Sequence, residues 1–270
     1  MPAEVVGGAS PSHSANRGAT VYVTGRSVRG EPTTDGLPGT IEDTAEEVTA
    51  RGGEGIPIRC DHTDDTQVRA CLAHIEDEAG RLDLLVNNVW GGYEYIDDEN
   101  VSGDGERFGV PFWQQPWDHW HGMFTAGVRA HLLTSRLAAP LLLESDAALL
   151  VNTTFWDQDK YLGNLFYDDA TSAINWMVYG MAIELQDHGV VAVAVSPGFM
   201  PTERVMANSP EHLERSESPE YIGRAVRALA ADDAVMDKTG RVLTVGNLAR
   251  EYDFTDIDVT QHPPFDIDGE

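Results

Sequence analysis

Short apolar runs alternate with stretches of helical periodicity along most of this chain. Each run has four to six mostly apolar residues, the length of a buried strand. The runs cover residues 3–6, 20–24, 56–60, 82–86, 148–151, 190–195 and 241–245. Between them, apolar residues recur every three or four positions, as Val68, Leu72 and Ile75 do. The alternation predicts an α/β fold with a doubly wound parallel sheet, covered by helices on both faces.

Several helix starts are marked by capping residues. Thr40 precedes a helical pattern and has Asp43 three positions on, which is the spacing of a capping box. Asp64 predicts the start of a second helix, and Ser218-Pro219 predicts the start of another. An aromatic stripe, Trp113, Trp117, Trp120 and Phe124, follows helical spacing. This spacing predicts that the four aromatic side chains lie on one face of a helix and pack in the core. The alternative is that they form a surface that contacts a cofactor or substrate.

Composition narrows the class of protein. The chain has 270 residues, 41% of them hydrophobic, which suits a single domain spanning residues 1–270. Its net charge of −27 argues against binding to nucleic acid or to anionic lipid. The only lysines are Lys160 and Lys238. An acidic, lysine-poor composition indicates a protein that works in a cytosol at very high salt, where salt screens the repulsion among its own negative charges. An ordinary acidic protein is the alternative.

Cysteine and histidine usage adds further limits. Cys60 and Cys71 are too few for a disulfide framework. His119, His121 and His131 have no partner set typical of a metal site, so no metal is expected. The chain has no run of about 18 apolar residues. Its first ten residues have no basic region and no long apolar stretch, so no secretory signal is expected. We therefore expect a cytoplasmic protein without a membrane span.

Two hydroxyls and a tyrosine are the main candidates for chemistry. The run at residues 148–151 leads into Thr153 and Thr154, and Tyr167 then opens a long helical pattern. In open α/β sheets, ligands bind at the carboxyl ends of strands. Tyr167 lies 13 positions after Thr154 and four before Thr171. This stretch resembles the catalytic segment of the short-chain dehydrogenase/reductase family, which pairs a Ser with a Tyr-x-x-x-Lys. The resemblance implies catalytic roles for Thr154 and Tyr167, with Thr171 at the Lys position.

The resemblance also implies a nicotinamide cofactor held near the strand ends. Residues 7–10, Gly-Gly-Ala-Ser, occupy the position of the family's phosphate-binding turn. The resemblance therefore implies that Gly8 and Ser10 bind the cofactor phosphates. The following helix is shorter than the family's by about two turns. The first β-α unit is therefore expected to be truncated, and an ordinary loop over residues 9–18 is the alternative.

Other cofactor positions follow later strands. Arg26 comes just after the second run, where an arginine favours the phosphate of NADP over NAD; a solvated surface charge is the alternative. In the family, the position of Asp61 lies near the adenine, and a cap or turn role is the competing interpretation. Asn87 matches the first Asn of the family's Asn-Asn-Ala-Gly motif. The Pro197-Gly198 turn matches the one that borders the nicotinamide, and Thr202 matches a residue close to its amide or phosphates.

The substrate side is predicted from aromatic residues. Residues 87–92, Asn-Asn-Val-Trp-Gly-Gly, resemble one branch of the family, in which Trp90 lines the substrate pocket together with Phe155 and Trp156. A core tryptophan is the alternative for Trp90. The family often places an Asn that holds a relay water at the position of Gly127.

Three segments depart from the strand–helix pattern. Residues 91–112 are acidic and rich in glycine, and predict an insertion at the pocket entrance. Residues 199–217 are charged and irregular, as expected of a lid. Residues 251–270 form an acidic tail that we expect to drape over the surface.

These features predict an NADP-dependent oxidoreductase acting on a carbonyl or alcohol. The alternative is a non-catalytic relative that binds a ligand or partner, because the Lys of the motif is absent and the glycine-rich loop is incomplete. Lys160, in the loop before Tyr167, is a candidate substitute for that Lys. The apolar stripes over residues 117–143 and 170–185, which the family packs between subunits, predict a homodimer or homotetramer with two-fold symmetry.

Overall fold

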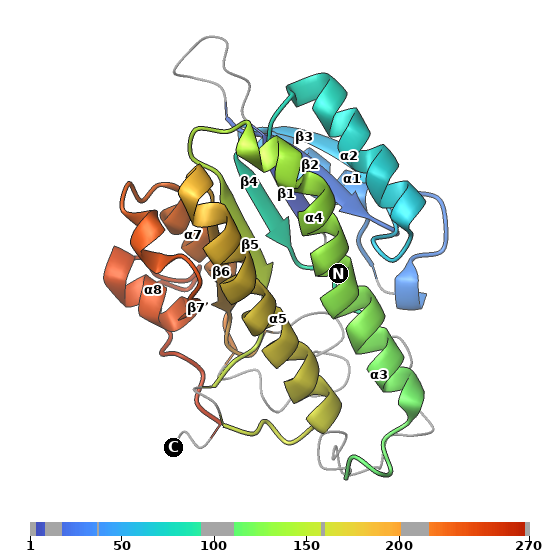
Figure 1. Ribbon diagram of the computed structural model, residues 1–270, viewed down its shortest axis with the longest axis vertical. Coiled ribbons are helices and arrows are strands. Elements are labelled where there is room, and N and C mark those ends of the chain that lie inside the picture. Colours follow the sequence, from blue (N-terminus) through green and yellow to red (C-terminus); the bar gives the residue numbers. More distant parts are fainter. Residues whose placement is uncertain are drawn as a thin grey trace.

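The computed structural model describes residues 4–8, 18–36, 38–92, 111–157, 160–200 and 216–267. Its centre is a seven-stranded sheet in the order β3-β2-β1-β4-β5-β6-β7, with helices packed against it (Figure 1). The strands are β1 (Glu4–Gly8), β2 (Thr20–Gly25), β3 (Glu54–Arg59), β4 (Leu84–Asn87), β5 (Leu149–Thr153), β6 (Val191–Ser196) and β7 (Val242–Thr244). The predicted α/β fold is confirmed.

Strand β1 is the exception to the predicted parallel arrangement. It pairs antiparallel with β2 and β4, with Glu4 opposite Thr24 and Gly8 opposite Thr20. The other neighbouring strands are parallel. Only residues 9–19 connect β1 to β2, whereas a parallel connection needs a dozen or more residues and usually a helix. The short connection therefore suits a reversed first strand, and it puts Gly8 at the edge where the parallel strands begin.

The helices alternate with the strands as the sequence predicts. The α-helices are α1 (Ile41–Ala50), α2 (Asp65–Ala79), α3 (Trp117–Met123), α4 (Ala130–Leu143), α5 (Leu165–Leu185), α7 (Pro219–Ala230) and α8 (Val245–Tyr252). A π-helical segment, η3 (Phe124–Arg129), joins α3 to α4. Short 3-10 segments are η1 (Thr34–Gly36), η4 (Gln186–His188) and η6 (Val235–Lys238). No helix among the described residues is both long and apolar enough to span a bilayer.

One face of the sheet is covered by α2, α4 and α5. Buried residues of these helices, such as Ile75, Leu142 and Val178, pack with Leu85 and Leu150 of the strands. Figure 1 looks onto this face, with α4 and α5 crossing in front of the strands. Each fully buried Leu or Ile contributes roughly 1.5–3 kcal/mol. This layer is the larger part of the core.

The opposite face carries α1, α7 and α8. Leu229 and Leu248 pack against Val193 of β6, while Ile41 packs against Val23 of β2. Along β4 the residues alternate, with Leu85 and Asn87 buried but Leu84 and Val86 only half-buried on the side of α7 and α8. The middle of this face is therefore less completely covered than the other.

Local sequence explains where most helices begin. Thr40 and Asp43 form the predicted capping box of α1, and Asp64 accepts from two backbone N–H groups at the start of α2. Ser218 is at the N-cap of α7, but its side chain makes no cap bond there. Helix α5 begins two residues before Tyr167 and is capped by Asn164. Helix α8 has no counterpart among the predicted elements.

Parts of the three irregular segments cannot be compared with the structure. Residues 93–110 of the predicted entrance insertion and residues 201–215 of the predicted lid lie outside the described residues. Ser10 and Thr202 also lie outside them.

Candidate active site

The carboxyl ends of β4 and β5 are tied together by amide side chains. Asn87 is fully buried and donates to Asn152 Oδ1 at 2.7 Å and to Ser135 Oγ of α4 at 2.8 Å. On the neighbouring strand end, Thr153 Oγ1 donates to Asn88 Oδ1 at 2.8 Å. Because these bonds span residues far apart in sequence, they fix the two strand ends and α4 relative to one another. Asn87 therefore serves as a structural tie at this edge of the sheet.

Thr154 links the end of β5 to helix α5. Its backbone N–H donates to the carbonyl of Val195 at 3.0 Å, which continues the pairing toward β6. Its hydroxyl is buried and donates to the carbonyl of Thr171 at 3.4 Å. The strand end and the first turns of α5 are thus in contact, as the family resemblance implies.

Tyr167 lies in the first turn of α5, between aromatic rings. Its backbone N–H donates to Asn164 Oδ1 at 3.1 Å, which fixes the start of the helix. Its ring lies edge-on to Trp90, with centroids 5.5 Å apart, and 6.2 Å from Phe155. Such edge-on contacts orient an aromatic ring. Three of the predicted site residues, Tyr167, Trp90 and Phe155, are therefore neighbours.

Thr171 cannot replace the charge of a lysine. It is buried, and its hydroxyl donates to the backbone carbonyls of Tyr167 at 3.0 Å and Asp168 at 3.2 Å. This back-bonding turns the side chain onto its own helix. Lys160 forms ion pairs with Asp266 at 2.5 Å and Asp157 at 3.5 Å. Both carboxylates keep its ammonium bound to the loop and the C-terminal residues.

Asp168 closes the loop that precedes α5. Its carboxylate accepts from the backbone N–H groups of Leu162 at 3.0 Å and Asn164 at 3.3 Å. Partial burial, with a smaller effect from the charge of Asp169, raises the pKa of Asp168 above its ordinary value. These carboxylates work against ionisation of a neighbouring phenol.

Trp90 and Gly127 fit each other in size. A Cβ atom built on Gly127 would lie 2.8 Å from the six-membered ring of Trp90, so this position of η3 has no room for a side chain. The buried Nε1 of Trp90 has no hydrogen-bond partner in the described part of the chain. An Asn at position 127 would collide with the indole. Residues 90 and 127 are far apart in the sequence, so no local pattern predicts that the large side chain of one requires the small residue at the other.

The C-terminal residues 256–267, which we call the C-terminal strap, lie against the loop after β5. Phe265 packs on Phe155 with ring centroids 4.8 Å apart. The backbone N–H of Ile267 donates to Asp157 Oδ2 at 2.7 Å, next to the ion pair of Lys160 with Asp266. Phe265 therefore joins the aromatic cluster around Tyr167, a role that its position in an acidic tail did not suggest.

Trp156 is anchored through its backbone. Its N–H donates to Ser196 Oγ at 2.9 Å, which ties the loop after β5 to the end of β6. This bond holds the loop that carries Phe155.

A buried carboxyl occupies the turn after β6. Glu217 Oε1 accepts from the backbone N–H of Gly198 at 2.7 Å, and a Cβ on Gly198 would lie 2.9 Å from Glu217 Oε2. Glu217 is 2% exposed. Burial raises its pKa to about 7, and the charge of Asp256 adds to this while the Gly198 N–H opposes it. No local pattern in the charged stretch around Glu217 predicted this contact with the Pro197-Gly198 turn.

The predicted cofactor residues divide between the two edges of the sheet. Arg26 follows β2 and Asp61 follows β3, so both lie at the carboxyl edge. Asp61 Oδ1 accepts from the N–H of Thr63 at 2.9 Å and from its hydroxyl at 2.7 Å, which is a turn contact. Gly8 pairs with Thr20 at the opposite edge. The prediction that Gly8 lies beside the other cofactor residues is therefore wrong in this structure, because β1 is reversed.

Two buried histidines support this edge. His62 bridges Thr24 Oγ1 at 2.9 Å and Thr134 Oγ1 at 3.0 Å, linking the end of β2 to α4. His131 of α4 is buried and donates from Nε2 to the carbonyl of Val89 at 3.0 Å. Burial lowers the pKa of His131 to about 4, with a smaller effect from His62. A neutral His131 holds the strand end that leads to Trp90.

Comparison with known proteins assigns the family. A family model described as enoyl-(acyl carrier protein) reductase matches residues 9–245. Dehydrogenase/reductase SDR family member 1 of Mus musculus is 32% identical and covers 89% of this chain, while the match spans 76% of that protein. The chain belongs to the short-chain dehydrogenase/reductase family. Its membership supports a general oxidoreductase function.

Solved structures agree on the fold. A putative dehydrogenase from Xanthomonas campestris has a TM-score of 0.76 at 22% identity, covering 94% of this chain and 89% of its own. A 7α-hydroxysteroid dehydrogenase, complexed with NADH and 7-oxo glycochenodeoxycholic acid, has a TM-score of 0.64 at 20% identity, covering 83% and 81%. At such identities the likeness concerns the arrangement of strands and helices.

Proposed function

We propose that this chain is an oxidoreductase that acts on the carbonyl or alcohol group of an apolar small molecule. The observation that carries the proposal is the hydrogen bond from Thr154, directly after β5, to the carbonyl of Thr171, which lies one turn after Tyr167 on α5. Tyr167 would exchange a proton with the substrate oxygen, and the Thr154 hydroxyl would turn from the Thr171 carbonyl to donate a second hydrogen bond to that oxygen. The surrounding rings of Trp90, Phe155 and Phe265 suit an apolar substrate.

Proton exchange by Tyr167 is expected to be inefficient. A tyrosine phenol has an ordinary pKa near 10, and general acid–base groups work best when their pKa lies near the working pH. A cation one helical turn away would lower the pKa of the phenol, but Thr171 is neutral and bonded to its own helix. We therefore infer a slow enzyme rather than a fast one.

The cofactor in this proposal is a nicotinamide dinucleotide, with NADP preferred over NAD because of Arg26. When bound, it supplies the hydride chemistry. The carboxyl ends of the strands carry residues suited to the adenine and nicotinamide ends of this cofactor, namely Arg26, Asp61, Asn87 and the Pro197-Gly198 turn. The reversed β1 does not fit the pyrophosphate, because Gly8 lies at the other edge. Ser10 and Thr202 remain candidates outside the described residues.

A ligand-binding relative without turnover is the second candidate. Two observations favour it, namely the neutral Thr171 at the lysine position and the reversed β1. Such a protein would use the aromatic cluster to bind a small molecule without reacting with it.

The assembly and setting are also part of the proposal. Exposed apolar residues on α4 and α5 support a homodimer or homotetramer. The net charge of −27 with two lysines supports work in a cytosol at very high salt.

Turnover separates the two candidates. The full chain in molar KCl is incubated with NADPH and a panel of apolar aldehydes and ketones, beside Tyr167→Phe and the exposed control Tyr161→Phe. The proposal expects slow reduction that Tyr167→Phe lowers by about 10²-fold or more and Tyr161→Phe leaves unchanged. Reduction that survives Tyr167→Phe would remove Tyr167 from its role, and saturable ligand binding with no reduction would favour the second candidate.

A further inference from the structure

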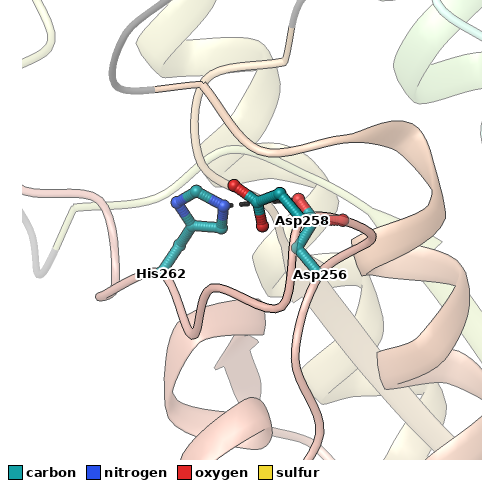
Figure 2. A group of neighbouring side chains, drawn as sticks. All are labelled: Asp256, Asp258 and His262. Carbon is teal, nitrogen blue, oxygen red and sulfur yellow. Dashed lines mark ion pairs between the residues drawn. The ribbon is translucent and has the colours of Figure 1, made fainter.

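The C-terminal strap carries a cluster of potential metal ligands at its beginning. Asp256, Asp258 and His262 each offer one ligand atom, and these atoms all lie within 4.8 Å of one another. Figure 2 shows the imidazole of His262 directed toward the two carboxyl groups. The three residues belong to one loop that follows α8, away from Tyr167 in the sequence.

Asp256 is buried and held in place by neighbouring donors. Its Oδ1 accepts from the hydroxyl of Ser218 and from the N–H of Ile257 at 2.7 Å, while Oδ2 accepts from the N–H of Ser218 at 2.7 Å. A carboxylate oxygen has about two acceptor sites. One site on Oδ2 therefore remains, and Oδ2 is the atom that lies 3.3 Å from His262 Nε2.

His262 presents a buried nitrogen to this oxygen. Nε2 is shielded from solvent and makes no hydrogen bond to any residue that the structure describes. The ring is oriented by an edge-on contact with the buried Tyr221, at 5.4 Å between centroids, and Tyr221 donates to the His262 carbonyl at 3.3 Å. The nitrogen lies within ion-pair distance of Asp256 Oδ2 but the two atoms lack hydrogen-bond geometry, so an ion bound between them would give both a partner.

The spacing matches that of ligands around a tetrahedral ion. Two ligands bound about 2.0–2.1 Å from Zn²⁺ at the tetrahedral angle lie roughly 3.3–3.4 Å apart. The distance between Nε2 and Asp256 Oδ2 is 3.3 Å. One imidazole and two carboxylates form a donor set that suits Zn²⁺ and similar transition ions, whereas Ca²⁺ takes six to eight oxygens.

We propose that Asp256, Asp258 and His262 bind one divalent transition-metal ion of the Zn²⁺ class, with water in the remaining position. Asp256 and His262 are the preformed pair, and the exposed Asp258 closes the site from the solvent side. The ion clamps the strap to the start of α7 through Asp256 and Ser218. The same strap continues to Phe265, which packs on Phe155 of the aromatic cluster. The clamp is therefore structural, and it steadies one wall of the candidate active site.

Metal titration of the full chain tests this site. Chelator-treated protein is titrated with ZnCl₂ by calorimetry and with CoCl₂ by visible absorption, since tetrahedral Co²⁺ has a distinct spectrum. The expected result is one ion per chain, a tetrahedral Co²⁺ spectrum, and a melting temperature that rises with Zn²⁺. His262→Gln and Asp258→Asn should each weaken binding by at least about tenfold. The matched exposed controls His188→Gln and Asp233→Asn should leave it unchanged.

Three results would overturn the proposal. One is the absence of stoichiometric Zn²⁺ binding to the folded wild-type chain. Another is equal binding by the site variants and the controls. The third is Mg²⁺ raising the melting temperature as much as Zn²⁺ does, because that would indicate loose association with an acidic surface. Circular dichroism of each variant establishes that a loss of binding is not a loss of fold.

Discussion

A tyrosine acts as an acid or base near neutral pH only when its surroundings favour the phenolate. Around Tyr167 the described surroundings do the opposite. Thr171, one turn along α5, is neutral, and Asp168 is a neighbouring carboxyl. The rings of Trp90 and Phe155 contact the Tyr167 ring without adding positive charge. At the scale of single residues, the neutral Thr171 at the lysine position is the feature that would limit the proposed proton exchange.

Thr171→Lys should therefore raise carbonyl reduction. An ammonium one turn from Tyr167 lowers the pKa of the phenol, and the expected gain is the roughly 10²–10⁴-fold typical of general acid–base assistance. The measurement is NADPH-dependent turnover together with ultraviolet titration of the phenol. Thr171→Met is the control for size without charge. An unchanged rate in a folded variant that binds NADPH would contradict the argument.

Glu217 gives a second prediction at this scale, for stability against pH. Its pKa is about 7 in the folded chain against an ordinary 4.5, because it is buried. The folded state therefore holds this proton between pH 4.5 and 7 while the unfolded state has released it. The free energy of unfolding should therefore fall by up to about 3 kcal/mol as the pH rises through this window, because the proton that stabilises the folded state is lost.

Denaturant unfolding at pH 5 and pH 8 measures this contribution. Glu217→Gln keeps an acceptor for Gly198 but cannot titrate, so it should reduce the difference in unfolding free energy between the two pH values. Glu220→Gln, in the first turn of α7, is the matched control. If Glu217→Gln and Glu220→Gln gave the same pH dependence, the buried carboxyl would not be its source.

At the scale of elements, the C-terminal strap completes the aromatic cluster. Phe265 packs on Phe155, and Ile267 and Asp266 bind the loop that carries Asp157 and Lys160. Loop segments of this kind often shape a binding site that a rigid sheet supports. The strap should therefore influence substrate binding more than the chemical step.

Phe265→Ala tests that role. Losing the ring opens one side of the cluster, so the KM for apolar carbonyl substrates should rise about tenfold, which corresponds to roughly 1.4 kcal/mol, with kcat little changed. Ile257→Ala is the control, since Ile257 belongs to the same strap but is exposed. A fall in kcat with no change in KM would assign Phe265 to the chemical step instead.

Most elements could be predicted because strand and helix periods are local properties of the sequence. The runs that became β2, β5 and β6 and the capping box of α1 needed only neighbours within a few residues. The direction of β1 could not be predicted from its own residues, because it depends on the length of the following connection and on pairing with β4. Helix α8 is short and lies directly after β7, so its period was hidden.

The candidate site shows the same division. Thr154, Tyr167 and Thr171 were predicted from spacing, and the structure brings them together. Other contacts join residues far apart in the chain and leave no local pattern, as with Trp90 on Gly127 or Glu217 at Gly198.

At the scale of the whole molecule, α4 and α5 carry an exposed set of apolar side chains. Its members are 43–74% exposed, namely Leu132, Leu143, Trp176, Tyr179 and Ile183. Contiguous exposed apolar residues mark interaction sites. With a net charge of −27, two copies of this chain repel each other unless salt screens the charge.

We expect this surface to lie between two copies of the chain in molar KCl. Trp176→Glu should put a charge into the centre of a two-fold interface and convert the assembly to monomer, as measured by light scattering. Tyr161→Glu, on an exposed residue outside α4 and α5, should leave the assembly unchanged. A wild-type chain that is monomeric at micromolar concentration and high salt would refute the interface.

The central claim is that the carboxyl edge of this sheet binds a nicotinamide cofactor although β1 is reversed. Fluorescence titration of the folded chain with NADPH and NADH in molar KCl tests it most directly. The account predicts saturable binding of one nucleotide per chain, with NADPH tighter than NADH. Arg26→Ala should weaken the binding of NADPH by about tenfold or more and leave the binding of NADH unchanged. No saturable binding of either nucleotide to the folded chain would contradict the claim.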